Sequence, residues 1–357
     1  MRMSPSEERV RAALSFRQSD RVPRFDSFWP EFEAIWRREK GLGEGVTPED
    51  YYGIDLVVAV ADETPWPTRA RILSDDGRER VSVDGWGRTI RTRVDAMFSE
   101  TVGVAVDDTA SLDSLAFDPP SLPERYAGYL ATVQAQKPKR AVFAKTGGPF
   151  LRTCFVRGET DYLMDLAADE RFASEIATRV KEHITAVGVE SLRLGAGLLS
   201  GIWIYDDVAA NANPMVSPRT YERVFLPLMA EMVSAYRAAG ADFVVFHSDG
   251  NILPLLPMLI EAGVDAINPV EPKAGMDAVA IRERYGRQLA LVGGLDNAFD
   301  LPSGDRERIA ASLQHLIEAG RDGGLILGCH SIGPDISVAT YEYLNRLEEA
   351  ARYPLAL

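Results

Sequence analysis

The sequence predicts an α/β barrel with additional elements near its N-terminal end, and three observations lead to this fold class. The chain has 357 residues, enough for one large domain of this kind. From about residue 126, short apolar runs alternate with longer helical stretches, as in parallel strands joined by crossover helices. Acidic, histidine and cysteine residues follow these apolar runs, where the loops of a barrel carry its chemistry.

The first 125 residues predict an N-terminal elaboration of helices and β-hairpins. A helix is expected over 5–17, with Ser4 as N-cap, Pro5 at the first helical position and Glu7 completing a capping box. Residues 19–29 read as a loop that enters a strand. Alternating apolar and polar residues over 69–106, with Asp-Gly turn signals, predict hairpins, and the acidic, proline-containing stretch 107–125 predicts a loop.

Residues 126–357 predict the main run of β/α units, and we expect 1–357 to form a single domain. A helix is expected to start near Ser217 and Pro218, which are good N-cap and first-turn residues. Other helices are expected at 160–195, 275–285, 304–320 and after residue 330. The expected strands are 140–146, 201–207, 242–247, 264–271, 288–296 and 323–330.

Composition excludes some classes of partner. The chain carries 53 acidic residues against 39 Lys and Arg, a formal net charge of −14, which disfavours nucleic acid as a partner. Two cysteines cannot form a disulfide framework, so we expect a reducing, cytoplasmic location. The first residues lack the apolar core of a signal peptide, and no apolar run reaches membrane-spanning length.

Five successive expected strands end in groups that bind metals or move protons. Because the C-terminal ends of barrel strands meet at one face, we expect these side chains to share a cavity there. In chain order they are Asp206 and Asp207, then His247 and Asp249, then Glu271, then Asp296, and finally Cys329 and His330.

Structural explanations remain open for several of these residues. Asp249 begins a turn-forming Asp-Gly-Asn sequence and could cap the next helix. Cys329 could be a small buried hydrophobic residue, and Glu271 could pair with Lys273.

The two adjacent acids at 206 and 207 could also be capping residues. Two acids at the end of an apolar strand are costly unless they are solvated or functional, so we favour a functional role. Asp296 follows two glycines, where the backbone can approach a ligand closely.

Four segments together resemble the uroporphyrinogen decarboxylase superfamily, most densely over 140–352. They are "YDDVAANANPMVSPRTYERVFLPLM", "FHSDGNILPLLPMLIEAGVDAINPVE", "LALVGGLDN" and "GGLILGCHSIGPDIS". The resemblance implies a TIM (β/α)8 barrel, in agreement with the reading of the strand pattern. It also implies one of two activities, and a homodimer.

The decarboxylase branch removes acetate carboxylates from a porphyrinogen without a cofactor. Its members share an arginine-rich N-terminal segment that grips the substrate carboxylates. Here Arg21 and Arg24 are present, but the family's Arg-Gln-Ala-Gly-Arg run is absent. The alternative is therefore a metal-free decarboxylase of a porphyrinogen or a smaller acid, in which Asp206 or Asp207 would stabilise the protonated pyrrole intermediate.

The other branch contains corrinoid-dependent methyltransferases, whose zinc is held by a His-x-Cys pair and a distant Cys. By this resemblance His247 and Cys329 are zinc ligands, with Asp249 where the first Cys would stand. A carboxylate is an accepted zinc ligand, and a harder ligand set favours an oxygen-bearing substrate such as a methoxy compound over a thiol. The methyl group would be exchanged with a corrinoid on a separate partner protein.

The remaining strand-end residues receive roles under this first hypothesis. Asp206, Asp207 and Asp296 would orient the substrate or handle protons. Glu271 and His330 would contact the substrate or complete the metal site, and Arg24 would contact the substrate. A third hypothesis, a tetrapyrrole-binding protein without turnover, fits the acidic strand ends less well.

Overall fold

The computed structural model describes residues 3–96, 99–108, 112 and 115–353. In this part of the chain, seven parallel strands form one curled sheet in the order β1-β6-β7-β8-β9-β10-β11. The α/β architecture predicted from the strand pattern is therefore present and is compatible with a TIM barrel. The strands are β1 (Leu56–Val60), β6 (Ala141–Gly147), β7 (Gly201–Tyr205), β8 (Phe243–His247), β9 (Ala266–Asn268), β10 (Ala290–Val292) and β11 (Leu325–Ile326).

The two edge strands of this sheet are linked by residues 23–28. The backbone N–H of Phe25 donates to Leu327 O at 2.8 Å, and the N–H of Leu327 donates to Pro23 O at 2.8 Å. On the other side, the N–H of Asp55 donates to Arg24 O at 3.0 Å, just before β1. The stretch that the sequence suggested as a loop entering a strand thus bridges the last strand and the first.

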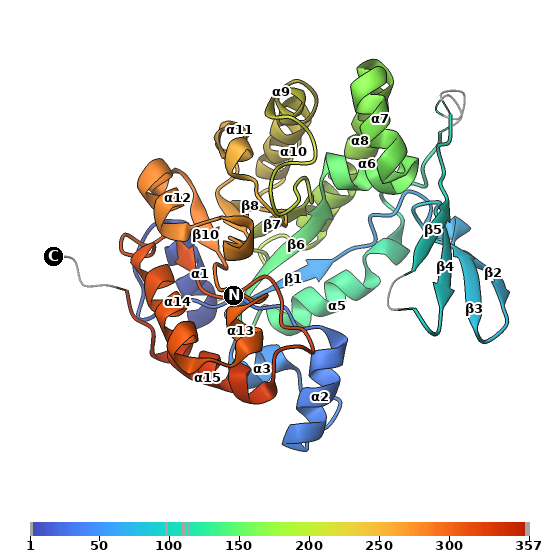
Figure 1. The fold of residues 1–357 in the computed structure, drawn as a ribbon. Coiled ribbons are helices and arrows are strands. Elements are labelled where there is room, and N and C mark those ends of the chain that lie inside the picture. Colours follow the sequence, from blue (N-terminus) through green and yellow to red (C-terminus); the bar gives the residue numbers. More distant parts are fainter. Residues whose placement is uncertain (1–2, 97–98, 109–111, 113–114, 354–357) are drawn as a thin grey trace.

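Helices surround the parallel strands, and a second sheet stands at one side of the molecule beside α6 and α7 (Figure 1). This four-stranded antiparallel sheet contains β2 (Arg71–Asp75), β3 (Glu79–Val83), β4 (Thr89–Arg93) and β5 (Glu100–Gly103). The predicted turn at Asp76-Gly77 joins β2 to β3, with Gly77 at a φ of 81°. β1 was not recognised in the sequence, although its run "LVVAV" lies within the segment assigned to the N-terminal elaboration.

The helices begin largely where the caps predict. Ser4 accepts a hydrogen bond from the N–H of Glu7, and Ser217 accepts one from the N–H of Thr220. The predicted capping box is wrong, because the Glu7 carboxylate binds Lys137 at 2.7 Å. The helices are α1 (Pro5–Leu14), α2 (Pro30–Lys40), α3 (Pro48–Tyr52), α5 (Ala127–Gln136), α6 (Pro149–Arg157), α7 (Glu159–Ala168), α8 (Glu170–Leu194), α9 (Pro218–Thr220), α10 (Leu226–Ala238), α11 (Leu256–Glu261), α12 (Ala278–Tyr285), α13 (Asp300–Ser303), α14 (Arg306–Glu318) and α15 (Val338–Ala350).

The apolar core has two layers separated by the parallel sheet. Alternate strand residues, such as Phe143, Trp203 and Val245, fill the inside of the curled sheet, whereas their neighbours pack outward against the helices. α1 contributes Val10 and Leu14 to the inner layer and so covers one end of it. These α1 residues meet the first residues of the strands, which leaves the C-terminal strand ends as the open face.

Within the described residues, no helix is both long and apolar enough to cross a membrane.

Candidate metal centre at the strand ends

Three polar side chains form a row across the C-terminal ends of β7, β8 and β9. The parallel register pairs Tyr205 with His247 and His247 with Asn268. All three continue the inward-facing positions of their strands, above Trp203 and Val245. The apolar interior therefore ends in a polar layer at the open face, and the Tyr205 and His247 rings stack with centroids 4.1 Å apart.

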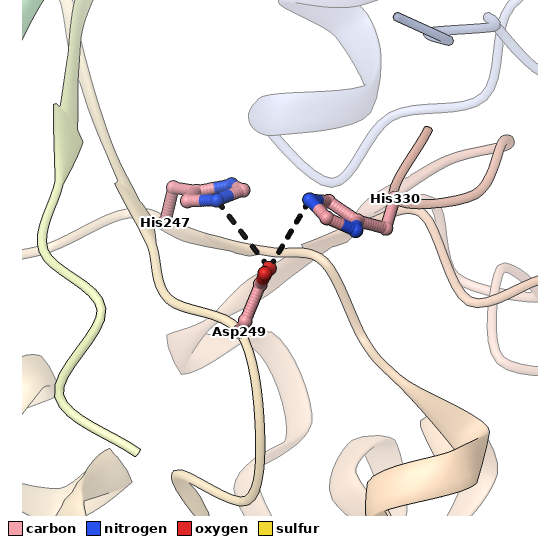
Figure 2. A group of neighbouring side chains, drawn as sticks. All are labelled: His247, Asp249 and His330. Atoms are coloured by element: carbon pink, nitrogen blue, oxygen red, sulfur yellow. Dashed lines mark ion pairs between the residues drawn. The ribbon is translucent and has the colours of Figure 1, made fainter. Parts of the chain in front are cut away.

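Asp249 lies between two imidazoles at this face (Figure 2). Its Oδ1 is 3.5 Å from Nε2 of His247 and 3.2 Å from Nε2 of His330. One ligand atom from each of the three residues lies within 4.8 Å of the others. Two ligands at about 2.0–2.1 Å from a tetrahedral zinc ion lie about 3.4 Å apart, so the two measured separations suit a shared metal.

The environment of His247 favours the form that binds metals. Its Nδ1 lies 2.7 Å from Asn268 Oδ1, and the Asn268 amide nitrogen donates to Val292 O at 3.1 Å. Because that carbonyl can only accept, the Asn268 oxygen must face the imidazole, and Nδ1 carries the proton. The Nε2 lone pair is then directed toward Asp249. Burial lowers the pKa of His247, which keeps the ring neutral.

The surrounding acids make this face attractive to a cation. Asp207 accepts a hydrogen bond from the N–H of Asp249 at 3.1 Å, and Glu271 accepts one from the N–H of Gly250 at 2.7 Å. Burial raises the pKa of Asp249 despite the nearby His330. Oδ1 of Asp249 is itself buried and has no hydrogen-bond partner among the described residues, which is costly unless a cation or ligand meets it.

Comparison with known protein families identifies the lineage of this fold. The model of the family "Uroporphyrinogen decarboxylase (URO-D)" matches residues 93–348, well over half of the chain. The chain belongs to the uroporphyrinogen decarboxylase family. Comparison with curated protein sequences gives no match.

Two solved structures were found to be similar to this chain over most of its length. A methyltransferase from Methanosarcina mazei is 18% identical with a TM-score of 0.69, over 97% of this chain and 98% of that one. A B12-independent methionine synthase from Shewanella sp. W3-18-1 is 10% identical with a TM-score of 0.46, over 93% of each chain. At 18% identity, the likeness to the Methanosarcina mazei structure shows the fold alone.

Cys329, expected as a metal ligand, is not brought together with His247 and Asp249. Its side chain is fully buried on the outer side of the sheet, where Sγ donates to Asp26 Oδ1 at 3.4 Å. Burial raises the thiol pKa well above its ordinary value, which disfavours the thiolate that binds zinc. The next residue, His330, faces Asp249 instead.

Asp206 and Asp207 likewise lie on opposite sides of the sheet. Asp206 is fully buried on the outer side, and its carboxylate accepts from the N–H groups of Phe150 and Leu151 at 3.3 and 2.7 Å, at the start of α6. Burial raises its pKa to about 7. Asp207 is partly exposed at the open face, with Oδ1 3.7 Å from His247 Nε2. Only the second acid therefore reaches the site.

Other predicted site residues make structural contacts. Asp296 caps the turn before α13, accepting from the N–H groups of Ala298 and Phe299 at 2.8 and 2.6 Å. Glu271 lies at the face and forms the expected ion pair with Lys273 at 3.1 Å. Nδ1 of His330 is also 4.0 Å from Glu271.

Arg24, expected to contact the substrate, has surroundings that indicate a structural role instead. The side chain is 1% exposed, and its guanidinium donates to Asn345 Oδ1 at 2.5 Å and to Tyr52 O at 2.6 Å. These contacts tie residues 23–28 to α3 and α15, away from the strand-end group.

Three residues of this face were not singled out in the sequence: Lys145, Tyr205 and Asn268. Each is the last polar or aromatic residue on the inward side of an apolar strand. Counting inward positions by twos from the centre of each strand would have found them.

Proposed function

We propose that this protein is a zinc-dependent methyltransferase that exchanges a methyl group between a small substrate and a corrinoid carried by a separate protein. The observation that supports it most is the convergence of His247, Asp249 and His330 at the open face, with a buried Asp249 oxygen that has no hydrogen-bond partner among the described residues. The methyltransferase fold neighbour from Methanosarcina mazei is consistent with it.

The proposed ligands are His247, Asp249 and His330, in place of the Cys329 expected from the family resemblance. Two histidines and one carboxylate resemble the ligand sets of catalytic zinc sites, which keep a position open for the substrate. Bound zinc would act as a Lewis acid on the substrate atom that carries or receives the methyl group. A set without thiolate is hard, which favours an oxygen-bearing methyl compound over a thiol.

The chain's own residues would prepare this site. Asn268 holds His247 in the tautomer with its proton on Nδ1. Asp207 accepts from the N–H of Asp249 and so fixes the backbone that carries the ligand. Glu271 and Asp207 are acids that lie close to the proposed ligands, and they would orient the substrate or receive a proton from it.

A metal-free decarboxylase remains the second candidate, because the family is named for that reaction and Asp207 lies at the open face. In that case Asp207 would stabilise a cationic intermediate. Against this candidate, the Arg24 guanidinium is already bonded within the protein, so it is not available to bind a substrate with many carboxylates.

The test is metal content per chain, measured by elemental mass spectrometry on protein purified without added metal or chelator. We expect close to one equivalent of zinc in the native protein and in Cys329→Ala, and strong depletion in His330→Ala. The matched control His315→Ala removes an exposed histidine that pairs with Asp277 and should keep the zinc. Loss of zinc in Cys329→Ala but not in His330→Ala would refute the ligand set. No metal in any form, even after zinc is added back, would favour the decarboxylase.

A further inference from the structure

Lys145 occupies an inward-facing position of β6 in register with Trp203, two residues before Gly147 at the C-terminal end of the strand. It follows Ala141 and Phe143, whose side chains lie in the inner layer of the core. An inward position that carries a lysine breaks the apolar pattern of this strand. Long charged side chains are rarely placed in such surroundings without a partner.

The ammonium group of Lys145 contacts an aromatic ring. Its Nζ lies 4.0 Å from the centroid of the Tyr205 ring, a cation–π contact. Among the described residues, no oxygen accepts a hydrogen bond from it and no acid forms an ion pair with it. A ring face does not satisfy the three N–H donors of an ammonium group.

The other basic side chains near this end of the strands are already paired. Arg152 binds Glu63 at 2.6 Å, and Lys273 binds Glu271 at 3.1 Å. Burial lowers the pKa of Lys145, with Arg152 adding to the effect, whereas Glu63 and Asp207 act in the opposite direction. Unlike Arg152 and Lys273, Lys145 therefore has no ion-pair partner among the described residues, and its charge is left for a ligand.

Tyr205 connects this lysine to the proposed metal centre. β7 lies between β6 and β8, and the Tyr205 ring contacts Lys145 from one neighbouring strand and stacks on His247 from the other. The unpaired cation and the metal ligands are therefore separated by about one aromatic ring. A small molecule could reach both at once.

We propose that Lys145 binds the carboxylate of a small organic acid whose methyl-bearing end lies at the His247–Asp249–His330 centre. This inference rests on the proposed function and names its substrate class. A monoanion fits better than a phosphate dianion, because Asp207, Asp249 and Glu271 already make the face acidic. The contact would give the ammonium group of this partly buried lysine the hydrogen-bonding partner that it lacks among the described residues.

The test compares a charged and a neutral probe of the same shape, methoxyacetate and methoxyacetamide, by ligand-observed NMR titration of the zinc-loaded protein. In Lys145→Met we expect the dissociation constant of methoxyacetate to rise about tenfold or more, as for loss of one charge-assisted contact. That of methoxyacetamide should stay within about twofold. Lys145→Arg should retain most of the preference for the acid. The control Lys139→Met removes a lysine that pairs with Asp50 and should behave as the native protein.

The outcomes separate this inference from the proposed function. Equal methoxyacetate binding by the native protein and Lys145→Met, or no saturable binding of methoxyacetate by the native protein, would overturn the inference even with zinc fully bound. Lys145-dependent binding of methoxyacetate in a chain that holds no zinc would support the anion site while refuting the metal site.

Discussion

Asn268 offers the sharpest test of the proposed metal centre, through the variant Asn268→Leu. The change removes the oxygen that lies 2.7 Å from Nδ1 of His247, a residue that is 5% exposed. A buried donor without an acceptor costs about 1–3 kcal/mol. The metal-free variant can avoid this cost by moving the proton to Nε2, which faces Asp249 and Asp207.

Zinc binding would then have to reverse that tautomer change. The same 1–3 kcal/mol would be subtracted from the binding free energy, so we expect zinc affinity to fall by about 10- to 100-fold. The assay is competition with a fluorescent zinc chelator at pH 7, with circular dichroism to show that the variant is folded.

Two further variants make the result interpretable. Asn297→Leu is the matched control, because Asn297 donates to Ser331 O at 2.9 Å and does not touch His247. Asn268→Asp keeps an acceptor oxygen and should keep zinc even if Asn268→Leu folds poorly. The reasoning would be refuted if folded Asn268→Leu bound zinc within about threefold of the native protein, or if Asn297→Leu lost as much affinity.

Three other predictions follow from the packing and the charges. Burial raises the pKa of Asp206 from 3.8 to about 7, so the unfolded chain loses this proton at a lower pH than the folded chain. The group therefore makes the free energy of unfolding fall as pH rises from about 4 to 7. Urea unfolding across this range should show a smaller fall in Asp206→Asn, and an unchanged pH dependence would contradict the assignment. In Gly328→Ala the new Cβ would lie 1.8 Å from the carbonyl oxygen of Phe25, at a φ of +141°. The pairing of residues 23–28 with the sheet should weaken, and the melting temperature should drop by several degrees. The control Gly128→Ala, whose Cβ would have nothing within 4 Å, should melt at or above the native temperature, and equal melting temperatures of the two variants would contradict the predicted clash. Saturating zinc should raise the melting temperature of the native protein but not of His330→Ala, as measured by scanning calorimetry, and an equal rise in both would place the metal elsewhere.

The sequence by itself determined the periodic part of this protein. Apolar runs such as "FVVFH" have few ways to be buried other than as strands, and the helical stretches between them require parallel crossovers. Local capping was also readable, since Ser4 and Ser217 act on residues three positions away. β1 was missed because its run has only five residues and lies outside the regular alternation of strands and helices that begins near residue 126.

Which side chains meet at the open face was decided only by the tertiary structure. Adjacent strand residues point to opposite sides of a sheet, so the pairs Asp206–Asp207 and Cys329–His330 each divide between the outer layer and the face. A one-residue uncertainty in where a strand ends exchanges the two members of such a pair. The register that aligns Tyr205, His247 and Asn268 comes from backbone pairing between segments far apart in the chain. Local sequence carries no record of that pairing, so it could not show which side chains become neighbours.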